Sequence, residues 1–185
     1  MADNLPIETE RLIIRPWRDS DRADYLATCN TEAVTTDLGG PAKVEDIDAS
    51  IGRIAKSQEE NGFCFWAVER KSDGAFIGYC GFKLARDEGT PIEGEVEIGW
   101  RLREDAQGQG YATEAASACL DWAWANLHVE RVISITVPAN RASWSVMVFP
   151  YSEDSSPRIA CVHSRMVRIS SVRAVTVGPP SNTSI

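Results

Sequence analysis

A glycine-bearing turn near the middle of the chain is the segment best suited to do chemistry. It runs from residue 107 to 115 and stands between an alternating, strand-like segment and an alanine-rich, helix-like one. Gly108 and Gly110 have no Cβ, so a polyanion can approach the main chain closely there. The unpaired N–H groups of the first helical turn would point at that anion. The turn therefore predicts a phosphate site built from backbone amides.

Two common phosphate-binding loops are excluded by their spacing. A Walker loop needs Lys and Ser/Thr at positions where this turn has neither, and a dinucleotide-binding fingerprint needs a third glycine at a set distance. A tight strand-to-helix turn, with glycine kept for packing, accounts for the same residues equally well. The neighbouring segments therefore have to decide between the two interpretations.

The elements expected around the turn form a mixed α/β fold. Alternation and branched residues predict strands over 11–15, 63–69, 75–84, 95–100 and 131–137, with a hairpin turn at 71–74. Ser20 or Asp21 is expected to cap a first helix, and a third helix is expected over 113–126. The second helix ends at Asn61-Gly62 and carries on one face Ile47, Ile51, Ile54 and Ala55. This order predicts a largely antiparallel central sheet covered by helices on both faces, not a doubly wound parallel sheet.

Composition places the chain among ordinary single-domain proteins. Its 185 residues are 43% hydrophobic, and no run approaches the ~20 apolar residues of a membrane span or shows a secretion signal. The net charge of -8 argues against a nucleic-acid surface. The five cysteines lack C-x-x-C spacing, which favours reduced, buried thiols and a cytoplasmic location: Cys29, Cys64, Cys80, Cys119 and Cys161.

Four segments, in order along residues 7 to about 147, resemble the GNAT (GCN5-related) N-acetyltransferases and their RimJ/RimL-like branch. Residues 8–17 resemble that branch's first strand, and 97–100 its fourth strand. Residues 107–112 resemble the family's pyrophosphate loop, Q/R-x-x-G-x-G/A, and 140–143 the N-x-x-S that follows the fifth strand. The resemblance implies a GNAT-like fold and an acetyl-CoA-dependent N-acetyltransferase.

The resemblance also implies where acetyl-CoA binds. In the family it lies between splayed fourth and fifth strands, with its pyrophosphate on the loop amides and its pantetheine paired along the fourth strand. No metal is implied. Trp100 also suits a core position, and Asn140 a helix N-cap. The implied binding residues are Ile98, Trp100, Leu102, Gln107, Gly108, Gln109, Gly110, Tyr111, Ala112, Thr113 and Asn140.

Acetyl transfer by direct attack in a ternary complex, as the family implies, needs a neutral amine and a proton for the leaving thiolate. Glu95 and Glu97 share one face of the expected strand, and Glu97 is the preferred base. Two exposed carboxylates are the alternative interpretation of that pair. Ser143 is expected to assist at the thiolate, and Glu114 to compensate the helix dipole. The acceptor is a primary amine, with a protein N-terminal α-amine as one candidate, and a homodimer is the family expectation.

The composition shifts after residue 148. Residues 1–148 carry a net charge of -10, whereas 149–185 carry four arginines, two acids and no lysine. Pro150 is expected to break the helix that starts near 140 almost as it begins. We therefore expect a GNAT domain over 1–148 and an atypical segment over 149–185, either frameshifted or recombined.

A divergent ending is the alternative, in which Ile159–Val162 and Val172–Val177 supply replacement strands. Two rival functions follow from an altered ending. One is a non-catalytic CoA- or acyl-CoA-binding module with a degraded acceptor half, and the other is an interaction protein that binds no nucleotide.

Overall fold

The computed structural model describes residues 5–86, 89, 91–136, 140–148 and 173–177. Its strands are β1 (Ile7–Glu8), β2 (Leu12–Arg15), β3 (Phe65–Arg70), β4 (Ala75–Leu84), β5 (Val96–Leu102), β6 (Val132–Thr136) and β7 (Arg173–Val177). Its α-helices are α1 (Asp21–Thr28), α2 (Glu32–Thr35), α3 (Val44–Asn61), α4 (Tyr111–Asn126) and α5 (Arg141–Val148). Two short 3-10 helices are η1 (Thr36–Leu38) and η2 (Glu104–Ala106).

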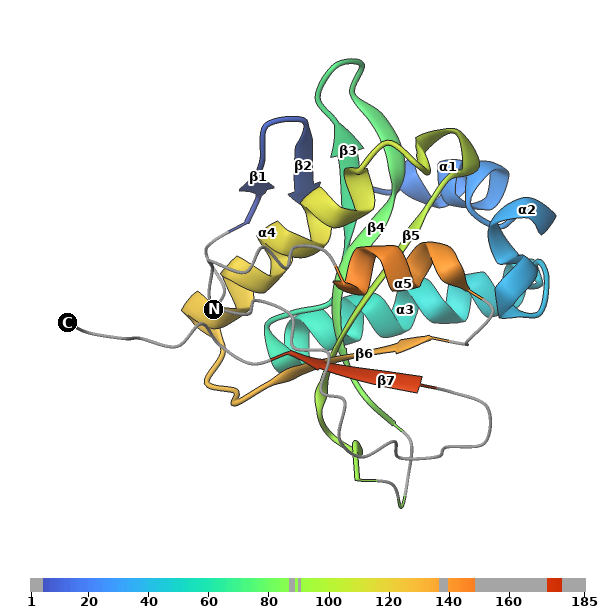
Figure 1. The fold of residues 1–185 in the computed structure, drawn as a ribbon. Coiled ribbons are helices and arrows are strands. Elements are labelled where there is room, and N and C mark those ends of the chain that lie inside the picture. Colours follow the sequence, from blue (N-terminus) through green and yellow to red (C-terminus); the bar gives the residue numbers. More distant parts are fainter. Residues whose placement is uncertain (1–4, 87–88, 90, 137–139, 149–172, 178–185) are drawn as a thin grey trace.

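The described strands form one sheet in sequence order, β1 to β7 (Figure 1). Neighbouring strands are antiparallel except β5 and β6, which are parallel and share a single registered pair, Glu97 with Ile133. By contrast, β4 and β5 pair along seven successive positions. The sheet is therefore continuous up to β5 and opens between β5 and β6.

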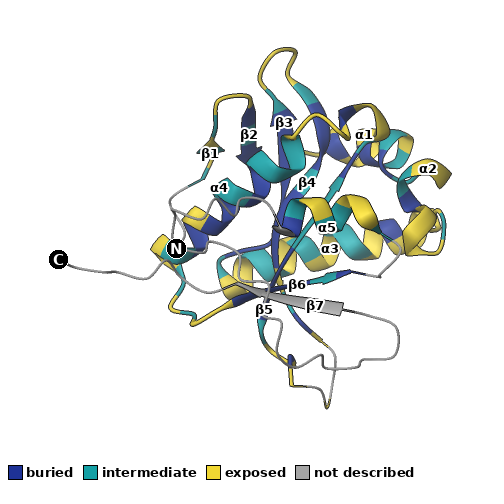
Figure 2. Cartoon of the chain, viewed as in Figure 1, coloured by how far each residue is buried: buried dark blue, intermediate teal, exposed yellow. Residues whose placement is uncertain are grey.

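Helices cover both faces of this sheet, as expected from the sequence. Helix α4 packs on one face, where Trp122 lies 4.8 Å from Trp66 between ring centroids. Helices α1 and α3 pack on the other, where Tyr25 and Ile47 join Phe76 in a second apolar cluster. Figure 2 shows the buried residues concentrated on the strands and on the inner side of α4.

A buried ion-pair network fixes the start of α1, and it corrects one expectation. Ser20 makes no side-chain cap. The Asp21 carboxylate instead accepts from Arg15 Nη1 and Nη2 at 2.7 and 2.9 Å and from the Arg18 backbone N–H at 2.7 Å. Arg15 also pairs with Glu69 at 2.8 Å. The Asp21 carboxylate thus joins α1 to Arg15 of β2, and Arg15 in turn pairs with Glu69 of β3. A buried guanidinium needs such anionic partners.

Most helix and strand positions agree with the sequence predictions. Helix α3 ends at Asn61 as predicted, and its C-cap Gly62 has a φ of 75°, the left-handed conformation that glycine favours. Three features differ. Ala55 is exposed, since its eight-residue offset turns it off the face of Ile47. The sequence patterns missed β1, α2, η1 and η2, which are too short to show a period. Helix α5 runs to Val148, longer than the early break expected from Pro150.

Four of the five cysteines are free and buried, as predicted, and Cys161 lies outside the described residues. Strand β7 pairs antiparallel with β6 over five positions, within the 172–177 segment expected as a replacement strand. Residues 159–162 lie outside the described part, and the division at residue 148 stays a prediction. No helix within the described ranges is long and apolar enough to cross a membrane.

Candidate active site

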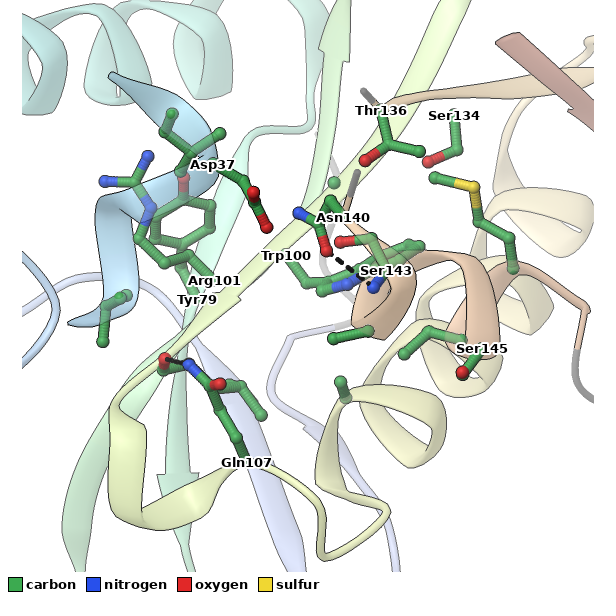
Figure 3. A pocket seen from close by; sticks show the side chains of 18 of the residues that line it. Asp37, Tyr79, Trp100, Arg101, Gln107, Ser134, Thr136, Asn140, Ser143 and Ser145 are labelled. Carbon is green, nitrogen blue, oxygen red and sulfur yellow. Dashed lines mark hydrogen bonds between the residues drawn. The ribbon is translucent and has the colours of Figure 1, made fainter. Parts of the chain in front are cut away.

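A cavity of about 740 Å³ lies where β5 and β6 separate. Residues 99–102 of β5 form one wall and 134–136 of β6 the other, while α2, η1, α5 and the start of α4 close its ends. Figure 3 shows Asp37 of η1 and Asn140 before α5 approaching it from opposite sides. A cleft of this size suits an extended small-molecule ligand.

The glycine turn forms one end of the cavity and leaves the start of α4 uncapped. Gly108 and Gly110 have φ of 70° and 80°, a left-handed conformation that glycine adopts without strain. Gly110 is the N-cap of α4, and no side chain caps the helix. The first turn, with the positive end of the helix dipole, therefore lies at the cavity, where its free N–H groups can accept an anion.

Glu114 in the first turn of α4 is held by the segment after β1. Its carboxylate accepts from the Thr9 hydroxyl, from the Arg11 backbone N–H at 2.9 Å and from Arg11 Nε at 2.6 Å. Desolvation raises the pKa of Glu114, but these hydrogen bonds outweigh it and hold the pKa below its ordinary value. Glu114 thus compensates the dipole from the side and does not block the amides.

Most of the predicted cofactor-binding residues line the cavity, but two do not. The cavity is lined by Trp100, Leu102, Gln107, Gly108, Gly110, Tyr111, Ala112, Thr113 and Asn140. Gln107 donates from Nε2 to the carbonyl of Leu102 at 3.0 Å and so ties the turn to the end of β5 (Figure 3). Ile98 and Gln109 do not line the cavity. Ile98 is buried in the core, and the Gln109 side chain donates to the carbonyl of Asp105.

Asn140 and Ser143 meet at the start of α5. The Asn140 Oδ1 accepts from the Ser143 backbone N–H at 2.9 Å, which makes Asn140 the side-chain cap of α5. Both residues also line the cavity. The N-cap interpretation of Asn140 is therefore correct, and the cap holds Ser143 at the cavity wall.

The two candidate carboxylates, Glu97 and Glu95, pair with different cations and differ in whether they line the cavity. Glu97 lies opposite Lys83 of β4, lines the cavity, and pairs with Lys83 Nζ at 3.0 Å. Its side chain is 8% exposed. Glu95 precedes β5, does not line the cavity, and pairs with Arg131. Of the two, only Glu97 is a buried carboxylate at the cavity, and its role as the base stays a prediction.

The sequence patterns did not predict an aromatic wall, formed by Phe65 and Tyr79, on the α1–α3 side of the cavity. The rings of Phe65 and Tyr79 lie 5.1 Å apart between centroids, and Arg101 donates to the Tyr25 hydroxyl beside them. Burial raises the pKa of Tyr79 to about 12, so its hydroxyl stays protonated at neutral pH. In the sequence Phe65, Tyr79 and Arg101 look like ordinary strand residues, and only the register between β3, β4 and β5 brings them together.

Comparisons with known proteins agree with this geometry. The model of the acetyltransferase (GNAT) domain matches residues 11–148. The uncharacterized N-acetyltransferase YnaD of Bacillus subtilis (strain 168) is 31% identical over 142 residues, which cover 76% of this chain and 78% of YnaD. The crystal structure of an acetyltransferase from Agrobacterium tumefaciens str. C58 is 26% identical, with a TM-score of 0.69 over 93% of both chains. The ribosomal L7/L12 α-N-protein acetyltransferase RimL shares the fold at 14% identity, with a TM-score of 0.67 over 95% of this chain and 93% of RimL.

The fold and the site therefore define an acetyltransferase. The chain belongs to the GNAT acetyltransferase family, whose domains use acetyl-CoA as cosubstrate and act on amine acceptors.

Proposed function

We propose that this chain transfers the acetyl group of acetyl-CoA to a primary amine by direct attack in a ternary complex, with an α-amine as the acceptor. One observation carries the proposal: β5 and β6 share a single registered pair and then enclose a cavity that ends at the uncapped start of α4. That geometry offers a strand edge for an amide chain and a set of helix N–H groups for a pyrophosphate.

The residues at the cavity fit acetyl-CoA. The amides from Gly108 to Thr113 would hold the pyrophosphate, because glycines leave them open and the helix dipole favours negative charge. The backbone of β5 from Ile98 to Leu102 has β4 on one edge and no registered β6 partner on the other, so it can pair with the pantetheine amides. In this proposal Ile98 contributes its backbone alone.

Glu97 is proposed to take the proton of the attacking amine, directly or through a water. The amine has to be neutral before it attacks. For an α-amine with a pKa near 8, this costs only about 1 kcal/mol at pH 7, whereas for a lysine near 10.4 it costs roughly 4–5 kcal/mol. The Lys83 ammonium lies 3.0 Å from the Glu97 carboxylate and pairs with it. An α-amine therefore demands less of the base than a lysine does.

The transfer forms a C–N bond and breaks the thioester C–S bond. The amine proton passes to Glu97, and the leaving thiolate takes a proton from the Ser143 hydroxyl, which regains one from water. The hydroxide left by that water takes the proton from Glu97, so that both side chains return to their starting states. The cap that Asn140 places on the Ser143 N–H fixes the start of α5 and so the position of that hydroxyl.

Turnover with a panel of primary amines tests the proposal. The purified full-length chain is mixed with acetyl-CoA and amino-acid amides, and both free CoA and the acetylated amide are quantified by mass. We expect equal amounts of the two products. Stabilisation by acetyl-CoA without any acetylated amine would instead support the non-catalytic CoA-binding module.

A further inference from the structure

A second cavity, of about 260 Å³, adjoins the aromatic wall of the first. It is a partly open cleft lined by residues of α1, α3 and the sheet. Four aromatic rings line it, those of Trp17, Tyr25, Phe65 and Tyr79, together with three isoleucines of α3, Ile47, Ile51 and Ile54. The polar groups at this cavity are few and come mostly from α3 and β5, namely Asp46, Ser50, Arg53 and Arg101.

Helix α3 leaves this space because it packs loosely on the sheet. Of its 18 residues, Ile47 is the one that is buried, and Figure 2 shows much of the helix in the intermediate and exposed classes. Ile51 and Ile54 follow Ile47 on the same face and reach the cavity only partly covered. The apolar face of α3 and the aromatic rings opposite it thus leave room for an apolar group.

The second cavity adjoins the first through three shared residues, Phe65, Tyr79 and Arg101. The Phe65 ring also lies against Gly99 of β5, where an added Cβ would come within 3.1 Å of the ring. Gly99 lies two residues from Glu97 on β5, so both residues are on the face of the sheet at which the two cavities share their lining residues.

We propose that the second cavity receives the aromatic side chain of the residue whose α-amine is acetylated. This inference rests on the proposed function, because it assigns one part of the acceptor to a defined place. The rings fix the chemistry of the occupant: Trp17 lies 5.9 Å from Tyr25 and 6.4 Å from Tyr79 between centroids, with tilted or edge-on planes. Such a set favours a further ring in an edge-to-face or offset arrangement.

The size of the cavity agrees with a single aromatic ring. An apolar cavity of about 150 Å³ is large enough to bind benzene. The second cavity exceeds that volume, so it is large enough for a benzyl group. A methyl side chain would leave most of it empty.

A matched pair of acceptors tests the inference. L-phenylalaninamide and L-alaninamide carry the same kind of α-amine and differ in the ring. We expect kcat/KM for the phenylalanine compound to be about 10- to 100-fold higher, the range expected for burying one Phe-sized side chain. Equal values for the two compounds would overturn the inference.

A cavity-filling variant tests whether the preference for the phenylalanine compound arises at the second cavity. Ile51→Trp fills the space under α3 and should remove the preference for the ring while L-alaninamide is still acetylated. Ala49→Trp, an exposed position on the same helix that lines neither cavity, is the control and should keep the preference. Should Ile51→Trp lower the melting temperature strongly, Ile54→Phe gives the same comparison with a smaller change.

Direct binding separates this inference from the proposed function. L-phenylalaninamide and L-alaninamide are each titrated into the full-length chain saturated with CoA, in which no transfer occurs. Tighter binding of the phenylalanine compound that Ile51→Trp abolishes supports the inference even if acetyl-CoA is never turned over. Turnover of both amides with no difference in their binding overturns the inference and leaves the proposed function standing, and absence of both binding and turnover overturns both.

Discussion

The Arg11 guanidinium links the segment after β1 to the start of α4, 103 residues further along the chain. Its Nε lies 2.6 Å from the Glu114 carboxylate, and its Nη1 donates to the carbonyl of Gln109 at 3.0 Å. The guanidinium also lies over the Tyr111 ring, 4.5 Å from the centroid. Arg11 thus holds both the glycine turn and the one acid in the first turn of α4, and it offsets that acid's charge beside the proposed pyrophosphate site.

Arg11→Ala is therefore expected to weaken acetyl-CoA binding more than it weakens the fold. The unpaired Glu114 carboxylate would repel the pyrophosphate, and we expect Kd to rise about 3- to 10-fold. The melting temperature should fall by no more than about 2–4 °C, because a partly exposed ion pair contributes about 1 kcal/mol or less. Calorimetric titration with acetyl-CoA measures the first effect and a thermal melt the second.

Arg22→Ala is the matched control, since Arg22 pairs with Asp48 on the surface away from the cavity. It should leave acetyl-CoA binding unchanged. An Arg11→Ala protein that binds acetyl-CoA as tightly as the wild type would show that the guanidinium has no electrostatic role at the site.

The lowered pKa of Glu114 predicts how stability depends on pH. A carboxyl whose pKa is lower in the folded state stabilises the fold above its unfolded pKa of about 4.3, and this contribution is lost as the pH falls through the folded pKa. Glu114→Gln should therefore cost about 1–2 kcal/mol at pH 7 and progressively less below about pH 4. Urea unfolding over this pH range measures the difference.

A surface glutamate provides the comparison for this pH effect. Glu60 pairs with Lys56 one turn away on α3, and both side chains are well exposed. Glu60→Gln should change stability by less than about 0.5 kcal/mol at every pH tested. If Glu114→Gln behaved in the same way, the hydrogen bonds from Thr9 and Arg11 would not be stabilising the ionised carboxylate.

The glycine turn was predictable from sequence because its signal is local. Gly108, Gly110 and the alanine-rich helix after them are adjacent in the chain, and each residue type has one clear backbone consequence. The choice of Glu97 over Glu95 rested on weaker evidence. It depends on which β4 residue lies opposite, and the register that brings Lys83 to Glu97 is a tertiary property.

The aromatic wall and the ion pairs could not be found in this way. Phe65, Tyr79 and Arg101 lie on three different strands, and a residue that lines a cavity has the same alternation as one that packs in a core. Arg11 and Glu114 are too distant in sequence for any pattern to connect them. The short η1 helix, which brings Asp37 to the cavity, carries too few residues to show a helical period.

Gly110→Asp tests the phosphate site on its own. Acetyl-CoA at about 100 times its Kd should stabilise the wild type by ~2.7 kcal/mol, which raises the melting temperature by roughly 5–11 °C. The variant places a carboxylate and a strained backbone at the N-cap of α4, so this shift should disappear.

Gly74→Asp controls for backbone strain in that experiment. Gly74 has a φ of 68° in the β3–β4 turn, has open space around its Cβ position, and does not line the cavity. Its variant should melt at a lower temperature than the wild type and still show the full shift with acetyl-CoA. Loss of the shift in both variants would mean that strain, and not the added charge at α4, removes binding.

Glu97→Gln tests the proposed base. Removing a general base costs about 10²- to 10⁴-fold in kcat, and we expect a loss of that order in the variant. Acetyl-CoA should still raise the melting temperature of the variant, since the proposed pyrophosphate site is on the α4 turn and does not include Glu97. Glu95→Gln, whose carboxylate pairs with Arg131 outside the cavity, should keep kcat within about 3-fold of the wild type. If the two variants lost activity equally, the proton would leave by another route and the pairing of Glu97 with Lys83 would be structural.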